Sequence, residues 1–354
     1  MKNLLATLTL LIILISAQPA RDSAQTLPVG SAPNIIVVTI DGFRWQEIFS
    51  GADEELINDP VITPDTSTMK MLYWADDKNE RRQKLMPFFW NVIAAKGQLY
   101  GNRDWGNKVN TANLYAFSYP GYNEIFTGTT DITISSNEKK LNSNRNVLEY
   151  LNQDESFKGK VVAFTSWDVF PYILNEKRSG FPINSGYENV SLEDSSGEWE
   201  LINRVQTEGV HTKTGTRHDQ LTFLMAKEYM QRYQPRVVFI GLGETDESAH
   251  AGRYDLYLEH ANTTDRLLAE LWHFVQSTPG YKDNTSLLIT TDHGRGKNKW
   301  TSHSAFIRGS SQTWLALLGP GVKSLGEVKD REQLYQNEMA GTIARMVGAD
   351  FKSR

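Results

Sequence analysis

Short apolar runs alternate with segments of helical periodicity along most of this chain. The apolar runs cover 34–40, 160–165, 236–241, 286–291 and 313–318, and the helical patterns cover 85–96, 146–152, 216–233, 254–276 and 333–347. Strands that are apolar at nearly every position are typical of a parallel sheet with helices on both faces. The pattern therefore predicts an α/β fold, a three-layer sandwich with a central, mostly parallel sheet flanked by helices.

The chain contains no internal repeat and no low-complexity linker, although 354 residues would be enough for two domains. We therefore expect a single catalytic domain over 32–354. The segment 51–82 is rich in Asp, Glu and Asn. We expect it to be an irregular insertion over one edge of the site, and we interpret it as a solvated surface loop rather than a substrate-binding element.

The first 24 residues have the pattern of a signal peptide. Lys2 is charged, residues 4–15 are almost wholly apolar, and the small residues Ser16, Ala17 and Ala20 follow. The apolar run is short for a membrane span, so no stable span is expected after cleavage. An uncleaved N-terminal anchor is the alternative. Either way the sequence predicts a periplasmic or secreted protein.

Charge and cysteine content exclude several classes of protein. The net charge is −5, from 37 basic and 42 acidic residues, so binding of nucleic acid by a basic face is not expected. The chain has no cysteine, which excludes disulfides and thiolate zinc sites. Metal sites built from histidine and carboxylate ligands remain open.

Three segments that follow apolar runs carry metal-type side chains. The candidate ligands are Asp41, Asp246, His250, Asp292 and His293, with His303 shortly after. The carboxyl ends of parallel strands meet at one edge of the sheet, which is where open α/β sheets place their ligands. If Thr245 caps a helix, Asp246 and His250 lie on one face of it. Each motif alone could be an ordinary turn. Together they predict two metal ions; nitrogen and oxygen ligands suit zinc, and other first-row divalent ions are possible.

Ser118 offers a hydroxyl nucleophile in the segment 117–122. Pro120 lies where a first helical turn would begin, and 121–126 could be the helix. The amino end of that helix would present backbone N–H groups to a phosphoryl oxygen. The alternative is that Ser118 is only a helix cap.

At this point the residues resemble a known family. The segments 40–44 and 118–128, Asp246 with His250, 292–294, and His303 look like the alkaline phosphatase superfamily, and the most similar branch is that of type I phosphodiesterases and nucleotide pyrophosphatases. The resemblance implies that one zinc is held by Asp246, His250 and His303. It implies that the other is held by Asp41, Asp292, His293 and the oxygen of Ser118. Ser118 would be phosphorylated and then released by water.

Two positions depart from the family patterns. The phosphodiesterase branch usually has Thr-Phe-Pro-Asn where this chain has Ser118 to Gly121, so Gly121 removes an amide side chain. Sulfatases of the superfamily carry Cys or Ser followed by x-Pro-x-Arg, and here the fifth position is Tyr122. Asn137 lies where the branch tends to place a phosphate-binding asparagine, and Asn142 and Asn144 are alternatives.

These observations predict an exported metal-dependent phosphoric-ester hydrolase, a phosphodiesterase or phosphatase, that acts on a small-molecule phosphate ester. The alternatives are a sulfatase or phosphotransferase of the same fold, or a catalytically silent metal-binding relative. We expect no role for His211, His218, His260 and His273. We interpret Arg295 and Lys297 as a solvated loop.

Overall fold

The computed structural model describes residues 33–190, 197–209, 211, 215–297 and 299–353. The expected signal peptide at 1–24 lies outside these residues. Within them, no helix combines the length and the apolar character that a membrane-spanning helix needs.

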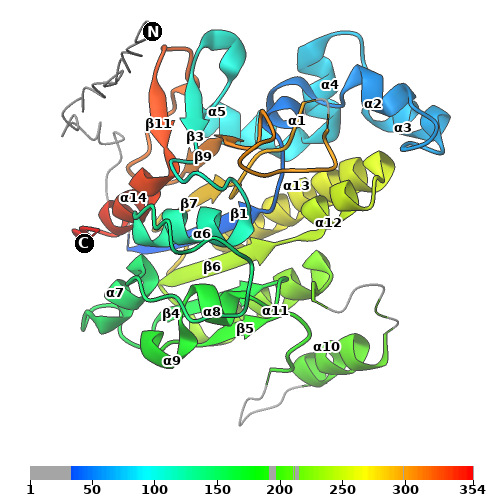
Figure 1. The fold of residues 1–354 in the computed structure, drawn as a ribbon. Helices are drawn as coiled ribbons and strands as arrows, with labels where there is room; N and C mark the ends of the chain where they lie inside the picture. Colours follow the sequence, from blue (N-terminus) through cyan, green and yellow to red (C-terminus); the bar gives the residue numbers. More distant parts are fainter. Residues whose placement is uncertain (1–32, 191–196, 210, 212–214, 298, 354) are drawn as a thin grey trace, which may run out of the picture.

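Eight strands form the central sheet, in the order β10-β2-β9-β7-β1-β6-β4-β5 (Figure 1). Their bounds are β10 Gly326–Glu327, β2 Gln98–Tyr100, β9 Leu315–Leu318, β7 Thr285–Thr290, β1 Asn34–Ile40, β6 Val237–Leu242, β4 Val161–Thr165 and β5 Ile183–Ser185. Strand β9 runs antiparallel to β7 and β2, and the other pairings are parallel. The predicted mostly parallel sheet is confirmed.

Alternate side chains of the central strands enter two separate hydrophobic cores. In β1, Ile36, Val38 and Ile40 belong to the first core. Ile35 and Val37 belong to the second. Full burial of one such side chain contributes about 1.5–3 kcal/mol, so both faces of the strand need a covering layer. This two-sided burial produces the predicted three-layer sandwich.

Helices cover both faces. Those that contribute to the first core are α1 Trp45–Ser50, α2 Glu54–Asn58, α3 Thr66–Tyr73, α4 Lys78–Leu85, η1 Phe89–Ile93, α10 Gly197–Glu208, α11 Asp219–Tyr233, α12 Glu244–His250 and α13 Tyr254–Ser277. Those that contribute to the second are α6 Ser118–Thr127, α7 Val147–Gln153, α8 Phe170–Ile173 and α14 Met339–Met346. The short elements α5 Ala94–Lys96, η2 Arg103–Trp105 and α9 Glu176–Ser179 complete the connections.

A second, three-stranded sheet corrects two predictions. It joins β11 Gln333–Tyr335, β3 Lys108–Asn110 and β8 Gln312–Thr313. The predicted strand 313–318 is divided, because Gln312 and Thr313 pair with β3 whereas Leu315 to Leu318 pair with β7 and β2. The predicted helix 333–347 starts later, at η3 Gln336–Glu338, because the residues before it pair with β3.

The segment 51–82 is helical, so the prediction of an irregular loop was wrong. Asp53, Asp65 and Asp77 each cap a helix, because their side chains accept hydrogen bonds from backbone N–H groups of α2, α3 and α4. Met69 and Tyr73 of α3 reach the first core. The acidic composition that suggested a loop therefore supplies helix caps. None of these residues lines the cavity of the candidate site.

Candidate metal centre

Three neighbouring strands deliver most of the candidate ligands. Strand β1 lies between β7 and β6, with Thr39 opposite Thr290 and Ile40 opposite Leu242. Asp41 follows β1, Asp292 and His293 follow β7, and α12 follows β6 after a single residue. The parallel register therefore brings these residues to one edge of the sheet, as the sequence predicted.

The first ligand set is Asp41, Asp292 and His293, which lie close enough to hold one metal ion. The Nε2 atom of His293 lies 3.5 Å from Oδ1 of Asp41 and 3.3 Å from Oδ2 of Asp292. Ser118 Oγ lies 3.4 Å from the same nitrogen. Both of these carboxylate oxygens are buried without a hydrogen-bond partner. Buried polar atoms are normally paired, so the four donors fit a cation among them.

The second ligand set is Asp246, His250 and His303. His250 Nε2 lies 3.1 Å from Oδ2 of Asp246 and 3.0 Å from Nε2 of His303. His303 Nε2 lies 3.8 Å from Oδ1 of Asp246. Two facing imidazole nitrogens can share only one proton, whereas a metal accepts a lone pair from both. His293 Nε2 lies 4.0 Å from Oδ1 of Asp246 and can group with Asp246 and His303, so the two sets adjoin.

Burial shifts the pKa values of four candidate ligands toward their uncharged forms. Burial is the main cause that raises the pKa of Asp292 to about 8, and the nearby carboxylate of Asp246 adds to it. Burial, followed by the charges of Asp292 and Asp246, raises the pKa of Asp41 well above its usual range. Burial also lowers the pKa of His303 to about 4 and that of His293 well below its usual range. Neutral imidazoles and crowded carboxylates are the groups that divalent cations bind.

Asp246 behaves differently because Arg295 lies beside it. Burial is the largest influence on its carboxyl and raises the pKa, but Arg295 and the three imidazoles outweigh burial and lower it well below the usual range. Arg295 is 1% exposed, so its interpretation as part of a solvated loop was wrong. Its Nη1 contacts Oδ1 of Asp246. A basic residue in a polar loop gave no sign of this burial in the sequence.

Arg295 also holds the segment that carries His303. Its Nε donates to the carbonyl of Trp300 at 2.6 Å, and its Nη2 donates to that of Thr301 at 3.0 Å. One buried guanidinium thus joins Asp246 on α12 to the loop just before His303. The second ligand set is therefore fixed by a residue that belongs to neither of the predicted metal sets.

The start of α12 is capped from another helix, not by Thr245. Gly243 is the N-cap residue, and the Asp219 carboxylate accepts from its N–H at 2.8 Å and from that of Glu244 at 3.1 Å. Glu244 returns the contact by accepting from the N–H of Asp219 at 3.0 Å. His218 Nδ1 lies 2.7 Å from Glu244 Oε1. This reciprocal capping fixes the position of Asp246, and it joins residues too far apart in sequence for local patterns to detect.

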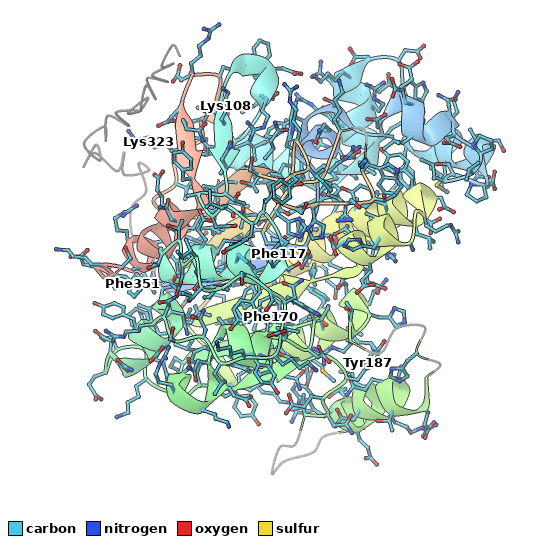
Figure 2. The ribbon with its side chains drawn as sticks, viewed as in Figure 1. Lys108, Phe117, Phe170, Tyr187, Lys323 and Phe351 are labelled. Atoms are coloured by element: carbon cyan, nitrogen blue, oxygen red, sulfur yellow. The ribbon has the colours of Figure 1, made fainter. Side chains whose placement is uncertain are left out.

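Ser118 is the first residue of α6, so the helix begins three positions before the predicted start at 121. Its N-cap, Phe117, marks the start of α6 in Figure 2. Ala116 just before it has a left-handed φ of 49°, an uncommon conformation for a residue with a side chain. Tyr122 Oη, one turn further along, donates to Oδ2 of Asp41 at 2.9 Å. The left-handed backbone at Ala116 and the hydrogen bond from Tyr122 to Asp41 together hold Ser118 next to the first ligand set.

No protein-family model matches the chain, and no curated protein matches it in sequence. Several solved structures, however, match it in fold. A variant of alkaline phosphatase PafA superposes with a TM-score of 0.56 at 11% identity, over 91% of this chain and 96% of that one. A protein of the alkaline phosphatase superfamily from Vibrio parahaemolyticus superposes with a TM-score of 0.53 at 10% identity, over 92% of this chain and 69% of that one. A 2-O GAG sulfatase superposes with a TM-score of 0.53 at 11% identity, over 91% of this chain and 72% of that one.

This is the fold of the alkaline phosphatase superfamily. At these identities the similarity establishes the fold alone. Phosphatase and sulfatase structures share it, so the substrate class has to be argued from the residues of this chain.

Among the asparagines proposed to bind phosphate, Asn137 lies at the site. It lines the same cavity, of 200 Å³, as Asp41, Ser118 and Asp246. Its Oδ1 accepts from the N–H of Tyr119 at 2.9 Å, so the NH₂ group of the same amide does not take part in this hydrogen bond. The sequence predicted that N–H groups at the start of this helix would be open to a phosphoryl oxygen. The N–H of Tyr119 is instead occupied by Asn137.

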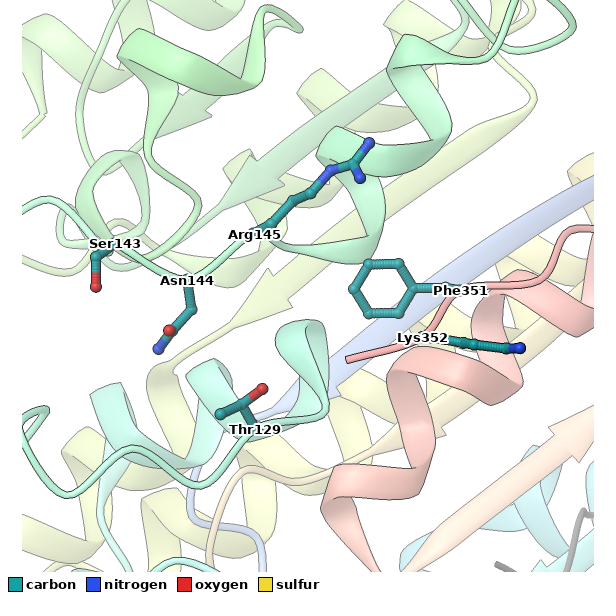
Figure 3. A pocket seen from close by; sticks show the side chains of 6 residues that line it. All are labelled: Thr129, Ser143, Asn144, Arg145, Phe351 and Lys352. Carbon is teal, nitrogen blue, oxygen red and sulfur yellow. The ribbon is translucent and has the colours of Figure 1, made fainter. Parts of the chain in front are cut away.

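The two alternative asparagines have structural contacts instead. Asn142 and Asn144 both donate to Oδ1 of Asn123, at 3.0 and 3.2 Å. Asn144 also lines a different cavity, of 180 Å³, together with Thr129, Ser143, Arg145, Phe351 and Lys352 (Figure 3). Neither ligand set contributes to that cavity.

Gly121 departs from the phosphodiesterase pattern for a steric reason. A Cβ at this position would lie 2.5 Å from the carbonyl oxygen of Asp292, so the helix could not stay where it is with any side chain there. We expect Gly121→Ala to lower the free energy of unfolding by about 1–3 kcal/mol, because the backbone must shift to relieve the overlap.

Gly197→Ala is the control for this prediction. Gly197 is the first residue of α10, and a Cβ added there would have no atom of the described residues within 4 Å. Urea denaturation would measure both variants. Equal stability of the two would contradict the steric explanation.

Proposed function

We propose that this protein is an exported, metal-dependent phosphoric-ester hydrolase in which Ser118 is the nucleophile. The observation that carries the proposal is the placement of Ser118 Oγ, 3.4 Å from Nε2 of His293, beside two buried and unpaired carboxylate oxygens. A silent relative would have no need for a hydroxyl at this point. The export part of the proposal rests on the pattern of residues 1–24 alone.

Two divalent ions, for which zinc suits the ligands best, would lower the pKa of the serine hydroxyl and neutralise charge on the leaving oxygen. Asp41, Asp292 and His293 would hold one ion, and Asp246, His250 and His303 the other. The Ser118 oxygen forms the new bond to phosphorus as the bond to the leaving alkoxide breaks. Water then attacks the phosphorus of this serine ester and restores the hydroxyl, which releases a phosphate monoester when the substrate is a diester and phosphate when it is a monoester. The NH₂ group of Asn137 would donate to a non-bridging oxygen.

The cavity lining supports a diester over a monoester. Glu247 lines the cavity, and its carboxylate accepts from Thr216 Oγ1 at 2.7 Å. A second negative charge on a phosphate monoester would be repelled there, whereas a diester carries one charge. Trp167 lines the same cavity and offers an aromatic surface to a leaving group. This lining therefore favours an activity of the phosphodiesterase and nucleotide pyrophosphatase type.

A substrate panel on the zinc-loaded protein tests this proposal. We expect kcat/KM for bis-p-nitrophenyl phosphate to exceed that for p-nitrophenyl phosphate and p-nitrophenyl sulfate, with a nucleotide diester also hydrolysed. Highest activity on the sulfate would identify a sulfatase, which is the alternative of the same fold. A protein that holds two metals and turns over none of the four substrates would be a silent relative, and the proposal would be wrong.

A further inference from the structure

A larger cavity, of 640 Å³, lies outside the candidate metal centre. Its wall combines the start of α1, at Trp45, with residues between 296 and 312 in the connection from β7 to β8. No residue that lines it also lines the cavity with Ser118. The connection thus contributes to both cavities, because His303 lines the one with Ser118 and residues on either side of His303 line this second one. Its volume is within the range of small-molecule sites.

The cavity carries unpaired positive charge. Lys297, Lys299 and Arg308 line it and are exposed. Among the described residues none of the three forms an ion pair, and none of the lining residues is acidic. Three cations around one hollow on a chain of net charge −5 make a local positive potential. An anionic group would be the complementary ligand.

The same cavity has aromatic walls. Trp45 is half-buried, and its Nε1 donates to Oε1 of Gln312 at 2.9 Å, which holds the indole in place. Phe306 is 98% exposed, the most exposed large apolar side chain among the described residues. A flat ring packed against these side chains would remove apolar surface from water. Charge alone would attract any anion, but the aromatic walls favour one that carries a ring.

We propose that this cavity binds a small aromatic anion, with the ring against Trp45 and Phe306 and the anionic group near Lys297, Lys299 and Arg308. The ligand could carry a phosphate, sulfonate or carboxylate group, because lysine and arginine bind all three. The proposal requires no metal and does not depend on the proposed hydrolysis. Failure of one can therefore be distinguished from failure of the other.

Titration of the zinc-loaded protein with 8-anilinonaphthalene-1-sulfonate, whose fluorescence rises on binding, tests the site. We expect binding at one site, weakened about tenfold or more in Lys297→Ser/Arg308→Ser and in Phe306→Ser. The matched controls are Lys323→Ser, labelled in Figure 2 and absent from the cavity lining, and Val61→Ser, which is 81% exposed. Neither control should change the dissociation constant. The uncharged analogue N-phenyl-1-naphthylamine should bind more weakly than the anion, and added salt should weaken only the anion.

Three results would overturn the proposal. The first is unchanged affinity in the charge and Phe306 variants. The second is equal affinity for the anion and its uncharged analogue, which would indicate a general apolar surface. The third is a dimer in sedimentation that Phe306→Ser converts to a monomer, because the cavity would then be part of an interface between two copies of the chain.

Discussion

Ser118→Ala is expected to bind metal and fold normally but to lose turnover of phosphate esters by several orders of magnitude. The loss follows because the covalent route needs an oxygen at this position. The fold should persist, since the Ser118 side chain caps no helix and its hydrogen-bond contact within the described residues is with His293. Steady-state kinetics with bis-p-nitrophenyl phosphate would measure the change, and elemental analysis would verify the metals.

Ser118→Thr is the matched variant. It keeps the hydroxyl and adds one methyl group, and threonine is the residue that the phosphodiesterase branch usually has. We expect it to retain most of the activity that Ser118→Ala loses. Undiminished activity in Ser118→Ala would instead mean that water attacks phosphorus directly and that Ser118 has no covalent role.

The purified protein should hold close to two first-row divalent ions per chain, and chelators should abolish its activity. The expectation follows from the two ligand sets around His293 and Asp246, and from the buried, unpaired carboxylate oxygens of Asp41 and Asp292 in the first of them. His303→Ala should weaken one ion by about tenfold or more and leave the other, at Asp41, Asp292 and His293, nearly intact. Equilibrium dialysis against zinc would resolve a tight and a weak site, and excess zinc should partly restore activity.

Metal binding should also depend on pH with a definite sign. In the metal-free protein the pKa of Asp292 is raised to about 8, so below that pH its carboxyl holds a proton that an ion must displace. Zinc affinity should therefore rise as pH increases toward 8, and binding at pH 7 should release protons.

Two undiminished zinc ions in His303→Ala, or a purified protein that holds a single calcium ion, would contradict the assignment of the two ligand sets.

The arrangement of the main elements could be predicted from local patterns. The apolar run 34–40 predicts a strand that is β1, Asn34–Ile40, and the helical pattern over 254–276 predicts a helix that is α13, Tyr254–Ser277. Both have strong periodic signals, because a strand buried on both faces is continuously apolar and a long amphipathic helix repeats its apolar residues. The prediction was wrong for 333–335, whose pairing depends on a distant partner, because a strand of three residues has no periodicity of its own.

The sequence by itself determined which groups could do chemistry here. Carboxylates and imidazoles directly after apolar strands had to meet at one edge of a parallel sheet, because the strands share a direction. The tertiary structure alone decided how those groups are held. Arg295 is buried against Asp246, Asp219 caps α12, and Gly121 lies against Asp292. Each of these contacts joins segments that are distant in sequence, and burial and capping of this kind depend on packing, which leaves no periodic trace in the chain.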